Sequence, residues 1–116
     1  MFILYGIPNC NTVKKAVDWL KKNDIIYTFH DYKKKGISEQ KLQEWTIQVG
    51  WERLVNKRGT TWKTLDEALQ LNINNTATAI GLMMAKTSVI KRPIIEHGNK
   101  IVAVGFDEKE YENVFY

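Results

Sequence analysis

The chain has 116 residues and a formal net charge of +4. This length is typical of one domain that buries a single core and needs no cross-links for stability. Its one cysteine excludes an internal disulfide, and its two histidines fall short of a usual zinc site. The lysines form short, scattered clusters with acids between them, which favours a solvated basic surface over a nucleic-acid footprint.

The first predicted elements are a strand, a helix and a second strand. Phe2 to Tyr5 is an apolar run ended by Gly6 and Pro8, which is typical of a buried strand. From Thr12 apolar residues recur at helical spacing, and Ile25 to Tyr32 is rich in β-branched and aromatic residues. This order predicts a right-handed crossover and a parallel pair of strands.

Helices dominate the middle of the chain. After a polar loop over 33–36, Ser38 is predicted to cap a helix that Gly50 ends. The stretch 51–87 lacks strand-like alternation and is predicted to be an all-helical insertion, with its clearest helix after Asn74 and Asn75. Its Met and Trp residues are better explained by core packing than by a ligand site.

The last predicted elements are an antiparallel hairpin and a helix. Pro93 to Glu96 and Ile101 to Val104 are the strands, with a turn over 97–99. Asp107 and Glu110 resemble a capping box, and the final helix has an apolar side of Tyr111, Val114 and Phe115. The sequence therefore predicts an α/β fold of order βαβα, helices, ββα, in one domain over 1–116.

Cys10 follows the first strand and its turn, at the start of the first helix. There it faces unpaired backbone N–H groups and the positive end of the helix dipole, which favour the thiolate. A lone cysteine is also often a small buried hydrophobe. Position alone supports an inert and a reactive thiol about equally.

Four segments together resemble the arsenate-reductase-like (ArsC/Spx-type) family, and are closest to its reductase branch. They match in order and spacing over essentially the whole chain: Tyr5–Ala16, His30–Lys33, Arg58–Trp62 and Ile90–Ile94. The resemblance implies a thioredoxin-like fold in which Cys10 is the nucleophile. It also implies that Arg58 and Arg92 line an anion pocket and that Pro93 is a cis-proline beside the substrate. Arginine suits such a pocket, because it keeps its charge and offers a planar fork of donors.

Three positions depart from the family's pattern. Arsenate reductases of this type have a histidine where this chain has Gly6 and a third arginine where Phe106 stands. Spx-type regulators have a second cysteine where this chain has Val13. These departures disfavour both arsenate reduction and an internal disulfide switch.

The remaining candidates are weaker. His30 is interpreted as a strand residue rather than a general base, and His97 as a turn residue. Asn9, Asn11 and Thr12 are predicted to cap the helix, to hydrogen-bond the thiolate, or both. Asn11 and Thr12 therefore join Arg58, Arg92 and Pro93 as expected substrate-binding residues.

The first function hypothesis is a monothiol oxidoreductase whose Cys10 adduct is resolved by glutathione, a co-substrate whose two carboxylates suit Arg58 and Arg92. The alternative is an Spx-like adaptor that docks on a protein such as RNA polymerase, and the third is an arsenate reductase. The expected substrate is anionic or a disulfide, with no bound cofactor or metal. Because Met1 to Gly6 lacks a signal peptide's basic flank and no apolar run spans a membrane, we expect a cytoplasmic protein without a membrane partner. We also expect it to be a monomer.

Overall fold

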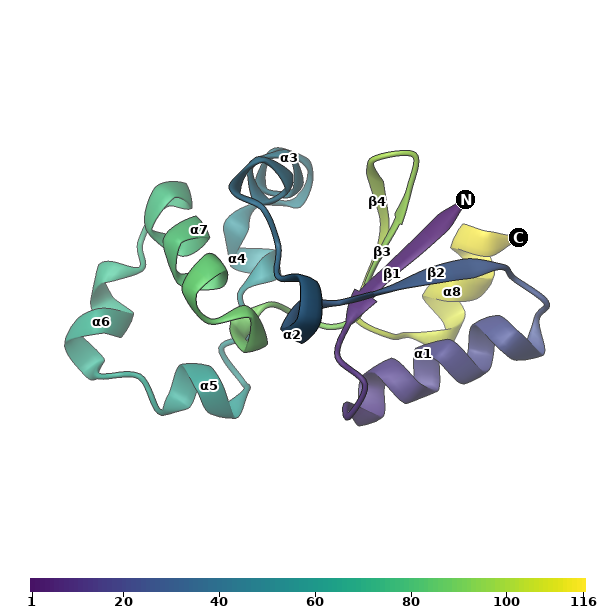
Figure 1. Ribbon diagram of the computed structural model, residues 1–116, viewed down its shortest axis with the longest axis horizontal. Coiled ribbons are helices and arrows are strands. Elements are labelled where there is room, and N and C mark those ends of the chain that lie inside the picture. Colours follow the sequence, from purple (N-terminus) through teal and green to yellow (C-terminus); the bar gives the residue numbers. More distant parts are fainter. The chain divides into compact units, whose positions relative to one another are not determined.

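The computed structural model describes residues 1–116 and contains a four-stranded mixed sheet (Figure 1). The strand order is β2-β1-β3-β4. The strands are β1 (Phe2–Gly6), β2 (Tyr27–Asp31), β3 (Ile94–His97) and β4 (Lys100–Val104). β1 pairs in parallel with β2 and antiparallel with β3, and β3 pairs antiparallel with β4. The predicted parallel pair and hairpin are both confirmed.

The chain divides into two units. The first contains Met1–Lys35 and Arg92–Tyr116, and the second contains Gly36–Lys91. The sheet belongs to the first unit, together with α1 (Asn11–Lys22), the short α2 (Tyr32–Lys35) and α8 (Glu108–Phe115). All the residues of the candidate site except Arg58 belong to this sheet unit.

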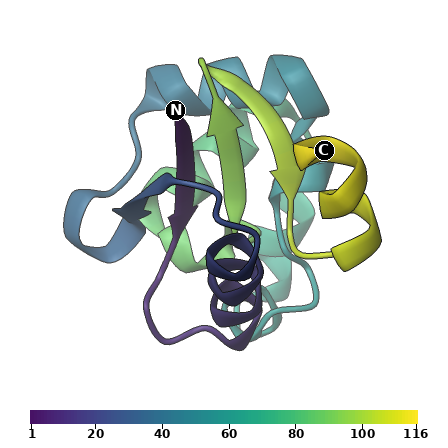
Figure 2. The ribbon, with the colours of Figure 1, turned by 90° about the vertical axis from the view of Figure 1, so that its right-hand side faces the viewer.

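Helices α1 and α8 lie on the same face of the sheet (Figure 2). One buried cluster joins them to the strands: Leu4, Val13, Ala16, Trp19, Leu20, Ile95, Ala103 and Tyr111. The helical spacing of the α1 members gives this helix a single buried stripe and leaves its lysines exposed. Trp19 contacts the rings of Tyr111 and Phe115, with centroids 5.4 and 5.6 Å apart. Packing of α1 against the sheet fixes the position of its first turn.

The hairpin turn is shorter than predicted. Only Gly98 and Asn99 form it, with φ of 55° and 65°, values that glycine and asparagine tolerate. His97 was predicted to be a turn residue, which is wrong: it ends β3, pairs with Lys100, and its ring lies 4.7 Å from that of Phe2. The aromatic contact and the ladder extend the strand by one residue.

Two other local predictions are wrong. The stretch 33–36 is not all loop, because Asp31 Oδ1 accepts the N–H of Lys33 at 2.8 Å and supports the helical turn of α2. Val114 was predicted to lie on the apolar side of the final helix, but it is exposed. Tyr111 and Phe115 are the residues of this helix that contact Trp19.

The second unit, Gly36–Lys91, contains only helices and their connections. They are α3 (Glu39–Val49), α4 (Trp51–Leu54), α5 (Thr60–Lys63), α6 (Glu67–Asn72), α7 (Thr76–Ala85) and the 3₁₀ turn η1 (Thr87–Val89). Ser38 Oγ accepts the N–H of Lys41 at 3.1 Å and Gly50 ends α3 with a φ of 83°, as predicted. The unit starts before the predicted 51–87 insertion, because α3 packs on α4 and α7.

Candidate functional site

Cys10 is held between the end of β1 and the start of α1. β1 ends at Gly6, a turn follows at Pro8 and Asn9, and Cys10 is the N-cap residue, with extended φ and ψ of −129° and 123°. Its carbonyl accepts the N–H of Lys14 at 3.0 Å, the first hydrogen bond of the helix. The thiol is partly exposed. A nucleophile in this position is reachable and faces the unpaired N–H groups of the first turn.

The surroundings of the Cys10 sulfur lower its pKa. Partial burial by itself raises the pKa, but the backbone N–H of Val13, the Arg92 side chain and the backbone N–H of Thr12 together outweigh this effect. The side chain makes no capping hydrogen bond of full geometry, so the N–H groups act as nearby donors and not as a formed cap. The Cys10 thiol therefore ionises at a lower pH than an ordinary cysteine.

Arg92, just before β3, acts on the Cys10 sulfur although it is far from it in the sequence. The Arg92–Pro93 peptide bond is cis, as the resemblance implied. The carbonyl of Pro93 accepts the N–H of Gly105 at 2.7 Å, which ties the start of β3 to the end of β4. Arg92 contributes both a hydrogen bond and a positive charge to the sulfur. Residues 82 positions apart are thereby brought into one site.

Asn11 and Thr12 are the first two residues of α1, and both are exposed. The prediction that Asn9, Asn11 or Thr12 caps the helix is wrong, because Cys10 itself occupies the N-cap position. Thr12 acts on the sulfur through its backbone N–H. Substrate binding by the two side chains stays a prediction.

Arg58 lies in the helical unit, on the exposed loop between α4 and α5. Its backbone N–H donates to Oδ1 of Asn56 at 3.2 Å. With Glu52, Lys57 and Lys91 it lines a hollow of about 350 Å³. Its lining has three cationic side chains and one acidic side chain, so the hollow favours anions. The expectation that Arg58 lies beside Cys10 stays a prediction.

A buried polar pair that the sequence analysis missed lies in the sheet. The Tyr5 hydroxyl donates to Oε1 of Glu96 at 2.7 Å, and Glu96 is 1% exposed. Tyr32, at the start of α2, is also buried, and its hydroxyl has no hydrogen-bond partner. Burial raises the pKa of Tyr32, with Tyr5 and Glu96 adding to the rise and Arg92 opposing it. The only sequence signal was an acidic residue within an otherwise apolar strand.

His30 lies in β2, as predicted, with its ring 4.7 Å from that of Tyr5. The structure contains no group of three or more His, Cys, Asp or Glu side chains that could hold a metal ion. None of its helices has the length and apolar character needed to cross a membrane.

Comparison with known proteins defines the family. The model of the ArsC family matches residues 5–114. The chain belongs to the ArsC family. An uncharacterised protein of Haemophilus influenzae is 44% identical over 115 residues, covering 99% of both chains. The solved structure of a YffB protein is 41% identical with a TM-score of 0.93, covering both chains completely. The global transcriptional regulator Spx of Streptococcus mutans is 27% identical over 95% of this chain and 80% of its own length.

This ArsC-family chain has the thioredoxin-like fold of its structural neighbours and a single partly exposed thiol. At residues 13 and 106, two of the positions that the resemblance identified as departures from the family's pattern, the side chains are apolar and packed. Val13 is buried in the core cluster, and Phe106 packs edge-on against Tyr111 with ring centroids 4.9 Å apart. Gly6 has no side chain at all. Neither side chain offers a charge or a second sulfur to Cys10.

Proposed function

We propose that the protein is a monothiol oxidoreductase that reduces disulfides through Cys10, with glutathione as the thiol that regenerates it. One observation carries the proposal: the pKa of Cys10 is lowered by two backbone N–H groups and by Arg92, although partial burial opposes the shift. A thiolate is the form of cysteine that attacks sulfur.

Cys10 takes part in two exchange steps. The Cys10 thiolate attacks one sulfur of a disulfide, the S–S bond breaks, and the second sulfur leaves as a thiolate that takes a proton from water. Glutathione thiolate then attacks the substrate sulfur of the Cys10 mixed disulfide, which releases the Cys10 thiolate and leaves that sulfur in a mixed disulfide with glutathione. In a further exchange that does not involve Cys10, a second glutathione releases this sulfur as a thiol and forms oxidised glutathione, so two glutathione molecules reduce one disulfide. The Arg92 guanidinium and the N–H groups of Thr12 and Val13 stabilise Cys10 as both nucleophile and leaving group.

The second thiol has to come from outside, because the chain has no other cysteine. Glutathione suits this role, since its carboxylates match the planar donors of arginine, and we assign one of them to Arg92. A reducing cytoplasm, where such a thiol is abundant, is the proposed location.

The test is intact mass spectrometry after exposure to oxidised glutathione, followed by reduced glutathione. We expect one glutathionyl group on the wild-type protein, its loss on adding reduced glutathione, and no adduct on Cys10→Ser. Failure of the wild-type protein to form the adduct would disprove the proposal.

A second candidate is an Spx-like adaptor that binds RNA polymerase, and the similarity to Spx over 95% of this chain supports it. Against a redox-switched adaptor, Val13 stands where the Spx type has its second cysteine. Binding of RNA polymerase to wild-type and Cys10→Ser proteins with equal affinity would favour the adaptor.

A further inference from the structure

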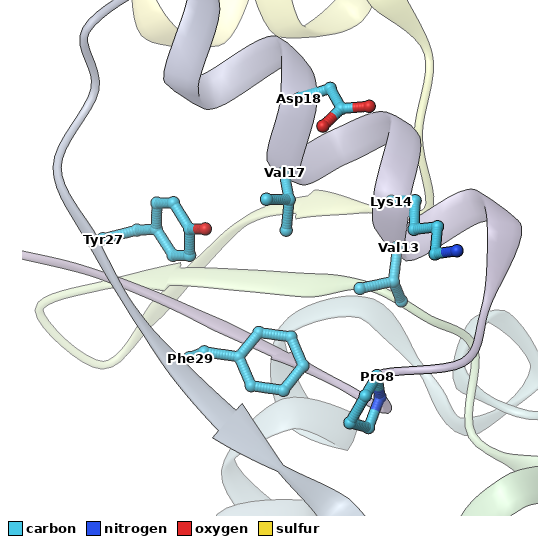
Figure 3. A pocket seen from close by; sticks show the side chains of 7 residues that line it. All are labelled: Pro8, Val13, Lys14, Val17, Asp18, Tyr27 and Phe29. Atoms are coloured by element: carbon cyan, nitrogen blue, oxygen red, sulfur yellow. The ribbon is translucent and has the colours of Figure 1, made fainter.

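A groove runs along α1 beside Cys10, between this helix and the edge strand β2. Its volume is about 350 Å³, and we call it the β2 groove. It is lined by Pro8, Val13, Lys14, Val17, Asp18, Tyr27 and Phe29 (Figure 3). The lining brackets Cys10 in the sequence, and the Val13 N–H is one of the groups that stabilise the Cys10 sulfur. Residues before and after Cys10 in the chain therefore line the groove, which follows α1 from its first turn.

Apolar side chains form the floor of the groove. Val13, Val17 and the ring of Phe29 point into it, and Pro8 lies at one end of it (Figure 3). Val17, Tyr27 and Phe29 are only partly buried, although they pack against the core cluster. Such a surface gains free energy when a second apolar group covers it.

Two opposite charges stand on the rim. Lys14 and Asp18, one helical turn apart on α1, are exposed and make no ion pair with each other. A peptide backbone presents both carbonyl acceptors and N–H donors, so it can satisfy a cation and an anion on the same rim. β2 is moreover an edge strand, the element on which extended peptides add to a sheet.

We propose that the oxidised substrate of Cys10 is a peptide disulfide with an apolar side chain near its cysteine, and that this side chain lies in the β2 groove. The inference rests on the proposed function of Cys10. In an extended peptide, residues two positions apart point to the same side. The apolar residue is therefore expected two positions from the reacting cysteine. The sulfur exchange itself follows the steps given above, with the peptide disulfide as oxidant and glutathione as reductant.

The test compares two peptides of one design, N-acetyl-Phe-Gly-Cys-Gly-Phe-amide and N-acetyl-Ser-Gly-Cys-Gly-Ser-amide, each with a methylthio group on its cysteine. Loss of free Cys10 is followed by intact mass at peptide concentrations below saturation. We expect the Phe peptide to react about tenfold faster, since partial burial of one aromatic ring gives a gain of this order. Phe on both sides of the cysteine makes the test independent of peptide direction.

Val17→Trp fills the groove and is expected to bring the ratio of the two rates close to one. Lys15→Trp is the matched control, because Lys15 is an exposed residue of the same helix that does not line the groove, and it should keep the wild-type ratio. A wild-type ratio near one, or an equal loss of preference in both variants, overturns the groove proposal and leaves the reactivity of Cys10 intact. If neither peptide reacts with the wild-type protein, the proposed function fails as well.

Discussion

Gly6 and Val13 are matched in size: a Cβ atom on residue 6 would lie 2.9 Å from Cγ2 of Val13. Real Cβ atoms essentially never come so close, so the end of β1 and the first turn of α1 approach each other only because residue 6 is glycine. Two of the three positions that the resemblance identifies as departures from the family's pattern are thus neighbours in space. A side chain at residue 6 requires Val13 to move.

Gly6→Ala is expected to lower the free energy of unfolding by about 1–3 kcal/mol, the usual cost of overpacking a core. Urea unfolding measures it. Gly81→Ala is the matched control, because Gly81 lies within α7 with nothing within 4 Å of its Cβ position, and there alanine should stabilise by up to ~1 kcal/mol. The double variant Gly6→Ala/Val13→Ala should lose less free energy of unfolding than the two single variants lose in sum, because the smaller residue 13 makes room for the new Cβ. Equal effects at residues 6 and 81 would contradict the predicted clash.

The lowered pKa of Cys10 predicts that its alkylation by iodoacetamide has a pH midpoint below that of free cysteine, ~8.5. A second consequence concerns stability. At pH values between the folded and the unfolded pKa of Cys10, the unfolded chain binds more protons than the folded chain. The free energy of unfolding of the wild type, relative to that of Cys10→Ser, therefore grows as the pH rises through this window, and we call this difference the stability advantage. The advantage is complete above the unfolded pKa and is lost as the pH falls through the folded pKa. A midpoint at or above that of free cysteine would identify the thiol as structural.

Arg92→Ala should raise the pKa of Cys10 and slow its alkylation near neutral pH, because it removes a hydrogen bond and a charge from the sulfur. The effect is at most about tenfold, since solvent screens a partly exposed site. Arg92→Lys restores the charge without the planar fork and should fall in between. Arg53→Ala, an exposed arginine of α4, serves as the control and should alkylate like the wild type. Wild-type rates in both Arg92 variants would mean that this residue does not act on Cys10.

Tyr5→Phe should lower the free energy of unfolding by about 1–3 kcal/mol, because it removes the hydroxyl that donates to the buried Glu96. Tyr116→Phe makes the same chemical change at an exposed hydroxyl, which donates to Asn23, and should cost far less. Urea unfolding of both variants gives the comparison. Similar losses in the two proteins would show that the Tyr5–Glu96 hydrogen bond adds little.

Arsenate reduction with glutathione and glutaredoxin is expected to be negligible. The resemblance implies that Gly6 and Phe106 stand where arsenate reductases of the family have a histidine and an arginine. Each lost hydrogen bond to a charged group typically costs ~1.5–3 kcal/mol. Two losses weaken transition-state stabilisation by about 10² to 10⁴. Disulfide exchange at Cys10 should persist in the same preparation. Strong arsenate turnover would show that other residues replace the missing two.

Local patterns in the sequence determined the elements that depend on neighbouring residues. The helical spacing after Thr12 gave α1 its buried stripe, Ser38 and Gly50 bounded α3, and Gly98 and Asn99 made the hairpin turn. Cys10 could be singled out as a candidate reactive thiol because a helix start acts on residues within one turn.

Only the tertiary structure decided which distant residues meet. Sheet pairing brings Arg92 to Cys10 and Glu96 to Tyr5, contacts across 82 and 91 positions that no local pattern encodes. The same packing puts Phe29 of β2 opposite Val13 and Val17 of α1 to form the β2 groove, and presses Val13 against Gly6. Burial and close approach depend on how elements pack. The sequence alone therefore singled out Cys10 as the candidate nucleophile, while the position of Arg92 beside its sulfur and the groove along α1 required the fold.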